Sequence, residues 1–184
     1  VKSITKFTWF LDNPSDIPYI LLKAIEIAKT GRPGPVLIDI PVDIQGSFFD
    51  IDKAKKYHSA GFEVYPSKKK IDEIYNHWLK SERPVILAGH GVRVSKTMDM
   101  LQTIAKKTNT PIVTTQLGKD IIPYDSDMFI GHPGIKGDRA GNLSLQYSDF
   151  ILCVGSSLHV LTTGYDVDKF APGAYIAKID IDNA

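Results

Sequence analysis

Short apolar runs alternate along the chain with segments whose apolar residues recur every three or four positions. The unbroken runs are typical of strands buried on both faces, and the spaced pattern is typical of amphipathic helices. The predicted strands are residues 36–40, 85–88, 111–114, 128–130, 150–154 and 174–181. The predicted helices are residues 16–30, after a turn and cap signal at 13–15, and residues 67–79, 96–107 and 139–147. This alternation predicts an α/β fold, a parallel sheet with helices on both faces.

One strand runs directly into a glycine turn. Residues 85–88 are followed by Gly89-His90-Gly91, and Ser95 is expected to cap the helix at 96–107. Strand, glycine turn and helix N-terminus together are the usual start of a nucleotide site. A tight turn with nothing bound is an equally good interpretation of the same residues.

Small and hydrogen-bonding residues follow the other predicted strands as well. Ligands of open α/β sheets bind beyond the carboxyl ends of the strands, so these residues are candidates for a nucleotide site. They are Gly89, His90, Gly91, Thr114, Thr115, Gln116, Gly131, His132, Gly155, Ser156, Ser157, Asp180 and Ile181. The NAD fingerprint is not met, because Val94 stands at its third glycine and no acidic residue lies about 20 positions further on.

Composition excludes several classes of function. The chain is 43% hydrophobic and 23% charged with a net charge of +1, so neither nucleic acid nor a membrane is an expected partner. The histidines have no metal-ligand spacing, and Ser156, Ser157 and His159 lack the G-x-S-x-G elbow of serine hydrolases. The single cysteine, Cys153, lies in an apolar run and fits a reducing cytoplasm.

The pattern divides the chain into three parts. Residues 1–46 hold one helix and one or two strands, too little to bury a core, and are expected to be the C-terminal part of a domain whose beginning is absent. Residues 47–66 have no clear period and are predicted to be a linker that packs across a surface through its aromatic residues. Residues 67–184 are predicted to form a second, nucleotide-binding-like domain.

Motifs along the whole chain resemble, in order, those of thiamine diphosphate enzymes of the acetolactate synthase type. Residues 31–45 resemble the end of their N-terminal, pyrimidine-binding domain. The following blocks resemble their Rossmann-like central domain: R-P-V-I-L-A-G-H-G-V (83–92), P-I-V-T-T-Q-L-G-K-D (111–120), I-G-H-P-G (130–134), S-D-F-I-L-C-V-G-S-S-L (148–158) and F-A-P-G-A-Y-I-A-K-I-D-I-D (170–182).

The resemblance implies a parent protein of three α/β domains that uses thiamine diphosphate and Mg²⁺ to act on a 2-oxo acid such as pyruvate. The activating glutamate of the family precedes residue 1 and its magnesium motif follows residue 184. No catalytic or metal-binding residue is therefore expected here, and the isolated chain is expected to be inactive. A full-length homodimer or homotetramer in the cytoplasm is also implied.

The central domain holds FAD in some family members, ADP in others and nothing in several. Flavin-binding members carry an arginine at the position of Ser157, and its absence disfavours flavin, because that arginine contacts a phosphate. Besides a piece of a carboligase or decarboxylase, two alternatives stay open. They are a stand-alone dinucleotide-binding module and a ligand-free scaffold domain.

Overall fold

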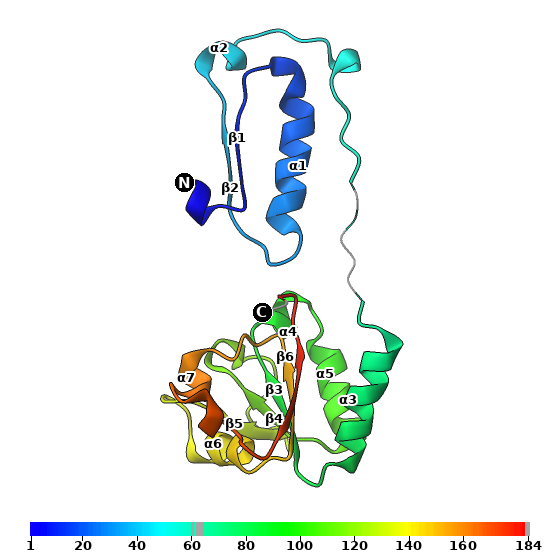
Figure 1. Cartoon of the computed structure of the whole chain (residues 1–184), viewed down its shortest axis with the longest axis vertical. Helices are drawn as coiled ribbons and strands as arrows, with labels where there is room; N and C mark the ends of the chain where they lie inside the picture. Colours follow the sequence, from blue (N-terminus) through cyan, green and yellow to red (C-terminus); the bar gives the residue numbers. More distant parts are fainter. Residues whose placement is uncertain (60, 62–64, 183–184) are drawn as a thin grey trace. The chain divides into compact units, whose positions relative to one another are not determined.

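The computed structural model describes residues 1–59, 61 and 65–182, which form two compact units. The first unit is Val1–Tyr65, and the second begins at Pro66 (Figure 1). Among the described residues, no helix has the length and apolar character needed to cross a membrane.

The first unit is built on two parallel strands and one helix. Strand β1 (Phe7–Phe10) pairs with β2 (Val36–Asp39), and α1 (Ile17–Lys29) packs against both. Four short helical turns accompany them: η1 (Lys2–Ile4), η2 (Pro14–Asp16), α2 (Val42–Gln45) and η3 (Ile51–Lys53). Among the described hydrophobic residues of this unit, only Leu11, Ile20 and Ala24 are buried, as expected for so few elements.

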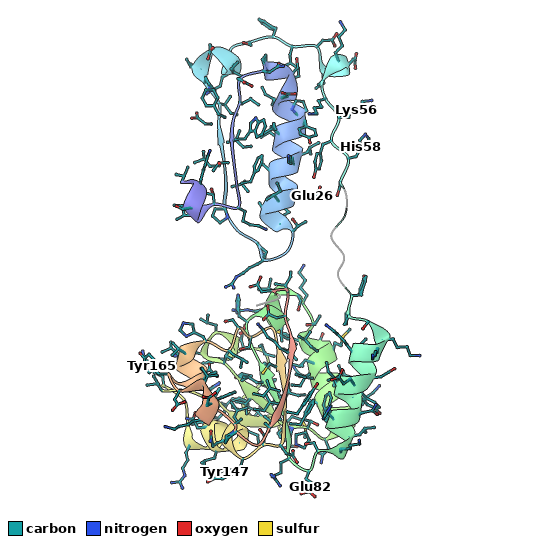
Figure 2. The ribbon with its side chains drawn as sticks, viewed as in Figure 1. Glu26, Lys56, His58, Glu82, Tyr147 and Tyr165 are labelled. Carbon is teal, nitrogen blue, oxygen red and sulfur yellow. The ribbon has the colours of Figure 1, made fainter. Side chains whose placement is uncertain are left out.

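The segment after η3 packs on α1 through one aromatic residue. The ring of Tyr57 meets that of Tyr19 edge-on, with 5.4 Å between their centroids. Figure 2 shows Glu26 on α1, with Lys56 and His58 on the segment that runs beside this helix. A hydrogen bond to the Glu26 carboxylate raises the pKa of Tyr57 to about 12. The packing predicted for the linker at residues 47–66 is therefore only partial, because its aromatic residues Phe48 and Tyr65 are exposed.

A parallel sheet of five strands forms the second unit, in the order β5-β4-β3-β6-β7. The strands are β3 (Pro84–Ala88), β4 (Ile112–Thr114), β5 (Phe129–Gly131), β6 (Phe150–Val154) and β7 (Tyr175–Ile179). Helices α3 (Lys68–Lys80) and α5 (Met98–Thr108) cover one face, and α6 (Arg139–Gln146) and α7 (Val160–Thr163) cover the other (Figure 1). The connections also contain α4 (Gly91–Val94), η4 (Gln116–Gly118) and η5 (Val167–Lys169). This architecture confirms the predicted α/β fold.

The two faces of the sheet bury separate hydrophobic clusters. Along β3, Ile86 and Ala88 belong to the cluster under α5, whereas Val85 and Leu87 belong to the cluster that contains Leu145 of α6. Successive side chains of a strand point to opposite faces, so a strand covered on both sides needs apolar residues at every position. This requirement explains the unbroken apolar run.

The apolar stripe of α3 is buried less than its spacing predicts. Ile74 and Trp78 pack against the core cluster, but Ile71, Tyr75 and Leu79 are 50%, 54% and 65% exposed. Such spacing usually marks a helix face that lies in the core, but here the core cluster reaches only one side of the stripe. Trp78 is well anchored: its ring stacks on Phe150 at 5.6 Å, and its Nε1–H donates to Thr110 Oγ1 at 3.0 Å.

Candidate functional site

The predicted site residues all follow, or end, strands of the five-stranded sheet. Because these strands are parallel, their carboxyl ends share one edge, and the strand order reverses between β3 and β6. Such a reversal is where open α/β sheets usually hold a nucleotide. A nucleotide at this point would need open space and unpaired backbone N–H groups in the loops.

The turn after β3 differs from its prediction. Gly91 begins a single helical turn, α4, and Ser95 ends it, with its Oγ bonded to the Val92 carbonyl at 3.1 Å. The long helix α5 starts only at Met98, and its N-cap Thr97 makes no side-chain capping bond. The prediction that Ser95 caps the long helix was therefore wrong. The sequence could not distinguish one continuous helix from a short turn followed by a second helix.

Backbone hydrogen bonds join the loops at the reversal. The N–H of Gly89 donates to the Val154 carbonyl at 2.8 Å, and the N–H of Gly91 donates to the Gly155 carbonyl at 3.0 Å. A Cβ atom on Gly91 would lie 2.7 Å from the Cα of Gly155, closer than real Cβ contacts. Gly155 itself has φ +58°, which favours glycine. We call this contact between residues 89–91 and 154–156 the glycine seam.

Next to the seam, His90 and Arg93 form a small polar cluster that includes Asp120. His90 Nδ1 lies 2.9 Å from Nη2 of Arg93, and Nη1 of Arg93 pairs with the Asp120 carboxylate at 2.5 Å. A guanidinium only donates hydrogen bonds, so His90 Nδ1 is the acceptor here. The ion pair is about half exposed, so it adds little to stability.

A second cluster links β4 to the loop after β5. The His132 Nδ1 lies 2.9 Å from the Thr114 hydroxyl and 3.1 Å from the Thr114 carbonyl. The carboxylate of Asp138 accepts from the N–H of His132 at 2.8 Å and from the N–H of Gly141 at 2.6 Å. Burial opposes ionisation of Asp138, but these bonds from Gly141 and His132 lower its pKa below the ordinary 3.8. Asp138 therefore caps α6 and fixes the position of His132.

Asp138→Ala is expected to reduce the free energy of unfolding by about 1–2 kcal/mol, because a helix loses its N-cap. The backbone N–H of His132 loses its acceptor in the same variant. Urea unfolding followed by circular dichroism would measure the loss. Asp125→Ala, at an exposed loop position, is the matched control and should change little. Equal effects of the two substitutions would contradict a structural role for the Asp138 carboxylate.

The remaining predicted residues lie in the seam, in neighbouring turns and on the surface. Ser156 is buried, and its Oγ accepts from the N–H of Leu158. Thr115 donates its N–H to the Ala88 carbonyl at 2.9 Å. Asp180 accepts from the N–H of Asp182 at 3.1 Å and so closes a turn. On the surface lie Gln116, Ser157 and Ile181.

Three charged residues of this edge were missed from the sequence: Arg93, Asp120 and Asp138. A signal existed for Asp138, since an aspartate directly before a predicted helix is a preferred N-cap. No local pattern connects Arg93 with Asp120, because the structure brings them together across 27 positions of the chain.

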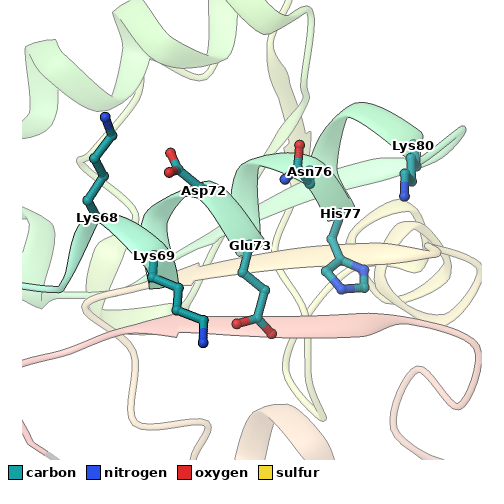
Figure 3. Close-up of a pocket in the computed structure, with 7 residues that line it drawn as sticks. All are labelled: Lys68, Lys69, Asp72, Glu73, Asn76, His77 and Lys80. Atoms are coloured by element: carbon teal, nitrogen blue, oxygen red, sulfur yellow. The ribbon is translucent and has the colours of Figure 1, made fainter.

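No metal site is found near these residues in what the structure describes. No group of three or more His, Cys, Asp or Glu among residues 1–59, 61 and 65–182 could hold a metal ion. The hollow in Figure 3 lies along α3, and the residues that line it, of mixed charge, all come from that helix. They are Lys68, Lys69, Asp72, Glu73, Asn76, His77 and Lys80.

Comparison with known proteins identifies the family. Residues 71–184 match the family model described as "Thiamine pyrophosphate enzyme, central domain". The chain is 36% identical to the acetolactate synthase large subunit of Corynebacterium glutamicum, over 98% of the chain and 29% of the relative. It is 37% identical to a probable acetolactate synthase large subunit of Methanocaldococcus jannaschii, over 98% of the chain and 31% of the relative.

A glyoxylate carboligase of Escherichia coli O157:H7 is 31% identical over 98% of the chain and 30% of the relative. The chain thus spans about three tenths of the length of these curated relatives. The matched region contains the five-stranded sheet and the edge where its strands end. The chain therefore belongs to the thiamine pyrophosphate enzyme family, and residues 71–184 are its central domain.

Proposed function

We propose that this chain is part of a thiamine diphosphate-dependent carboligase or decarboxylase that acts on 2-oxo acids such as pyruvate. One observation carries the proposal: relatives named acetolactate synthase large subunit align with 98% of the chain at 31–37% identity. A relative named glyoxylate carboligase is 31% identical, so the proposal names the substrate class, 2-oxo acids, and not one substrate.

The first unit fits the C-terminal part of a pyrimidine-binding domain. Its sheet has only two parallel strands with one long helix packed on them, too few elements to bury a core of their own. Three apolar side chains of α1 are also exposed: Leu21, Leu22 and Ile25 are 41%, 51% and 50% exposed. We therefore assign residues 1–46 to that domain, 47–66 to a linker and 67–184 to the central domain.

In this assignment the chain supplies structure rather than chemistry. Thiamine diphosphate, which would supply the electron sink for reactions of 2-oxo acids, and the Mg²⁺ that would bind its diphosphate would be held by residues outside the chain. A parent protein in the form of a cytoplasmic homodimer or homotetramer remains a prediction from the resemblance. Two alternative functions, a stand-alone dinucleotide-binding module and a scaffold domain without ligand, differ in what the strand ends bind.

The test is an assay of the intact protein that carries this chain. With thiamine diphosphate and Mg²⁺, pyruvate should be consumed and carbon dioxide released, and a parallel reaction with glyoxylate would separate the two named activities of the relatives. Omission of thiamine diphosphate is the control, and it should abolish turnover. Failure to consume any of a panel of 2-oxo acids would contradict the proposal.

A further inference from the structure

The strand order of the central domain places its expected nucleotide site at the glycine seam. In this family fold the ligand to be tested is a nucleotide diphosphate such as ADP or FAD, so the inference rests on the proposed function for the identity of that ligand. Whether the residues fit such a group is decided by the backbone donors and the space at residues 89–91 and 154–156. Phosphate sites of this kind use free N–H groups and the N-terminus of a long helix.

Four of the five backbone N–H groups in the turn after β3 (residues 89–93), all but that of His90, have acceptors within the fold. The N–H groups of Gly89 and Gly91 bond to the carbonyls of Val154 and Gly155, as described above. Those of Val92 and Arg93 bond to the carbonyls of Gly89 and His90, both at 3.1 Å. A phosphate that approached this turn would have to displace hydrogen bonds that hold the sheet edge together, which makes binding costly.

The long helix α5 does not begin at the glycine turn, so its N-terminus is not available to a phosphate there. Gly91 begins the four-residue helix α4, and α5 starts only at Met98. The macrodipole effect falls off within the first turn of a helix, so α5 cannot assist a phosphate held at Gly91. Ser157, in the loop after β6, offers a phosphate a neutral hydroxyl and no positive charge.

Space at the seam is limited as well. A Cβ atom on Gly89 would lie 2.3 Å from the Gly155 carbonyl oxygen and 2.7 Å from the Cα of Ser156. The glycines thus permit two loops to touch each other, which leaves no room between them for a ligand. Their presence after the strands is explained by this contact without any nucleotide.

We propose that the glycine seam is a closed structural joint, and that the central domain of this protein works as a spacer that binds no nucleotide. The lack of a positive charge at Ser157 is then secondary, because introducing one there would not open the seam. A closed edge would bind no nucleotide even with an arginine at position 157. An open edge that lacked only the positive charge would bind nucleotide once that arginine is present.

The experiment measures binding of ADP and FAD to the full chain and to Ser157→Arg, by calorimetry and by thermal denaturation. At about 1 mM nucleotide, a dissociation constant near 10 µM would raise the melting temperature by several degrees. We expect no binding and no shift for either protein. Binding of ADP or FAD by the unmodified chain, or by Ser157→Arg, would overturn the proposal.

A second arm tests the seam without any ligand. Gly91→Ala is expected to lower the melting temperature of the nucleotide-free protein, because its Cβ meets Gly155 at 2.7 Å. Gly173→Ala is the matched control, since nothing lies within 4 Å of a Cβ there. Equal melting temperatures for the two variants would show that the loops are not in tight contact and would also overturn the proposal. Neither arm measures turnover by the intact enzyme. Each can therefore reject the closed seam without rejecting the proposed function.

Discussion

Phe150→Ala is expected to lower the free energy of unfolding of the central domain by about 3–5 kcal/mol, the usual cost of truncating a buried aromatic residue. Phe150 is 1% exposed and is the first residue of β6, which pairs with β3 on one side and β7 on the other. Its ring stacks on Trp78 at 5.6 Å and on Tyr175 at 6.0 Å. Removing it leaves a cavity and breaks the only aromatic link that we find between α3 and β6 among the described residues.

Urea unfolding followed by circular dichroism measures this loss. Phe48→Ala is the matched control, because Phe48 is fully exposed and its removal should change stability by less than about 0.5 kcal/mol. A loss below about 1 kcal/mol for Phe150→Ala would show that the site collapses around the smaller side chain and that Phe150 is not central to the core.

Asp149→Ala is expected to cost about 1.5–3 kcal/mol at neutral pH, in the range of hydrogen bonds to charged groups. Its carboxylate accepts from the hydroxyl of Ser81 and from the N–H groups of Glu82 at 2.8 Å and Arg83 at 2.9 Å. These donors lie between α3 and β3, and Asp149 directly precedes β6. One side chain thus fixes the entry into the two central strands.

The effect of Asp149 depends on pH in a defined direction. Burial opposes its ionisation, but the hydrogen bonds from Ser81, Glu82 and Arg83 outweigh burial and hold the pKa at about 2, below the ordinary 3.8. A carboxyl with a lowered folded-state pKa stabilises the fold above the unfolded value and loses that contribution as the pH falls through the folded value. The stability difference between the native chain and Asp149→Ala should therefore be full above about pH 4 and shrink towards pH 2.

Denaturant unfolding of both proteins at a series of pH values tests this expectation, and Asp125→Ala serves as the control for general acid effects. A difference that stays constant from neutral pH down to pH 2 would mean that the charge of Asp149 is not what stabilises the joint.

The elements of the central domain were largely predictable from the sequence because burial on both faces leaves a strong local signal. The strand predicted at residues 150–154 is the observed β6, and the one predicted at 85–88 differs from β3 only by Pro84. A local signal also existed at the start of α3, where Ser67, a preferred N-cap residue, accepts from the N–H of Lys70.

Features that depend on distant parts of the chain were not predictable. The exposure of Tyr75 follows from how far the core reaches across α3, which spacing alone does not encode. Gly91 and Gly155 are candidates for a nucleotide site in the sequence, but the structure fills the Cβ position of each with the loop of the other. A glycine marks close approach without stating what approaches, so the predicted nucleotide site residues remain a prediction that the binding experiment must decide.

The position of β3 in the middle of the sheet has a consequence for synthesis of the protein. Its partner β6 lies far along the chain, and the hydrogen bond between Arg83 and Asp149 closes a separation of 66 residues. At translation rates of roughly 5–20 residues per second, the ribosome needs about 3–13 s to cover that distance. During this interval β3, apolar on both faces, has one edge that no native strand can yet pair. The nascent chain is therefore most exposed to aggregation, and most dependent on chaperones, between the synthesis of β3 and that of β6.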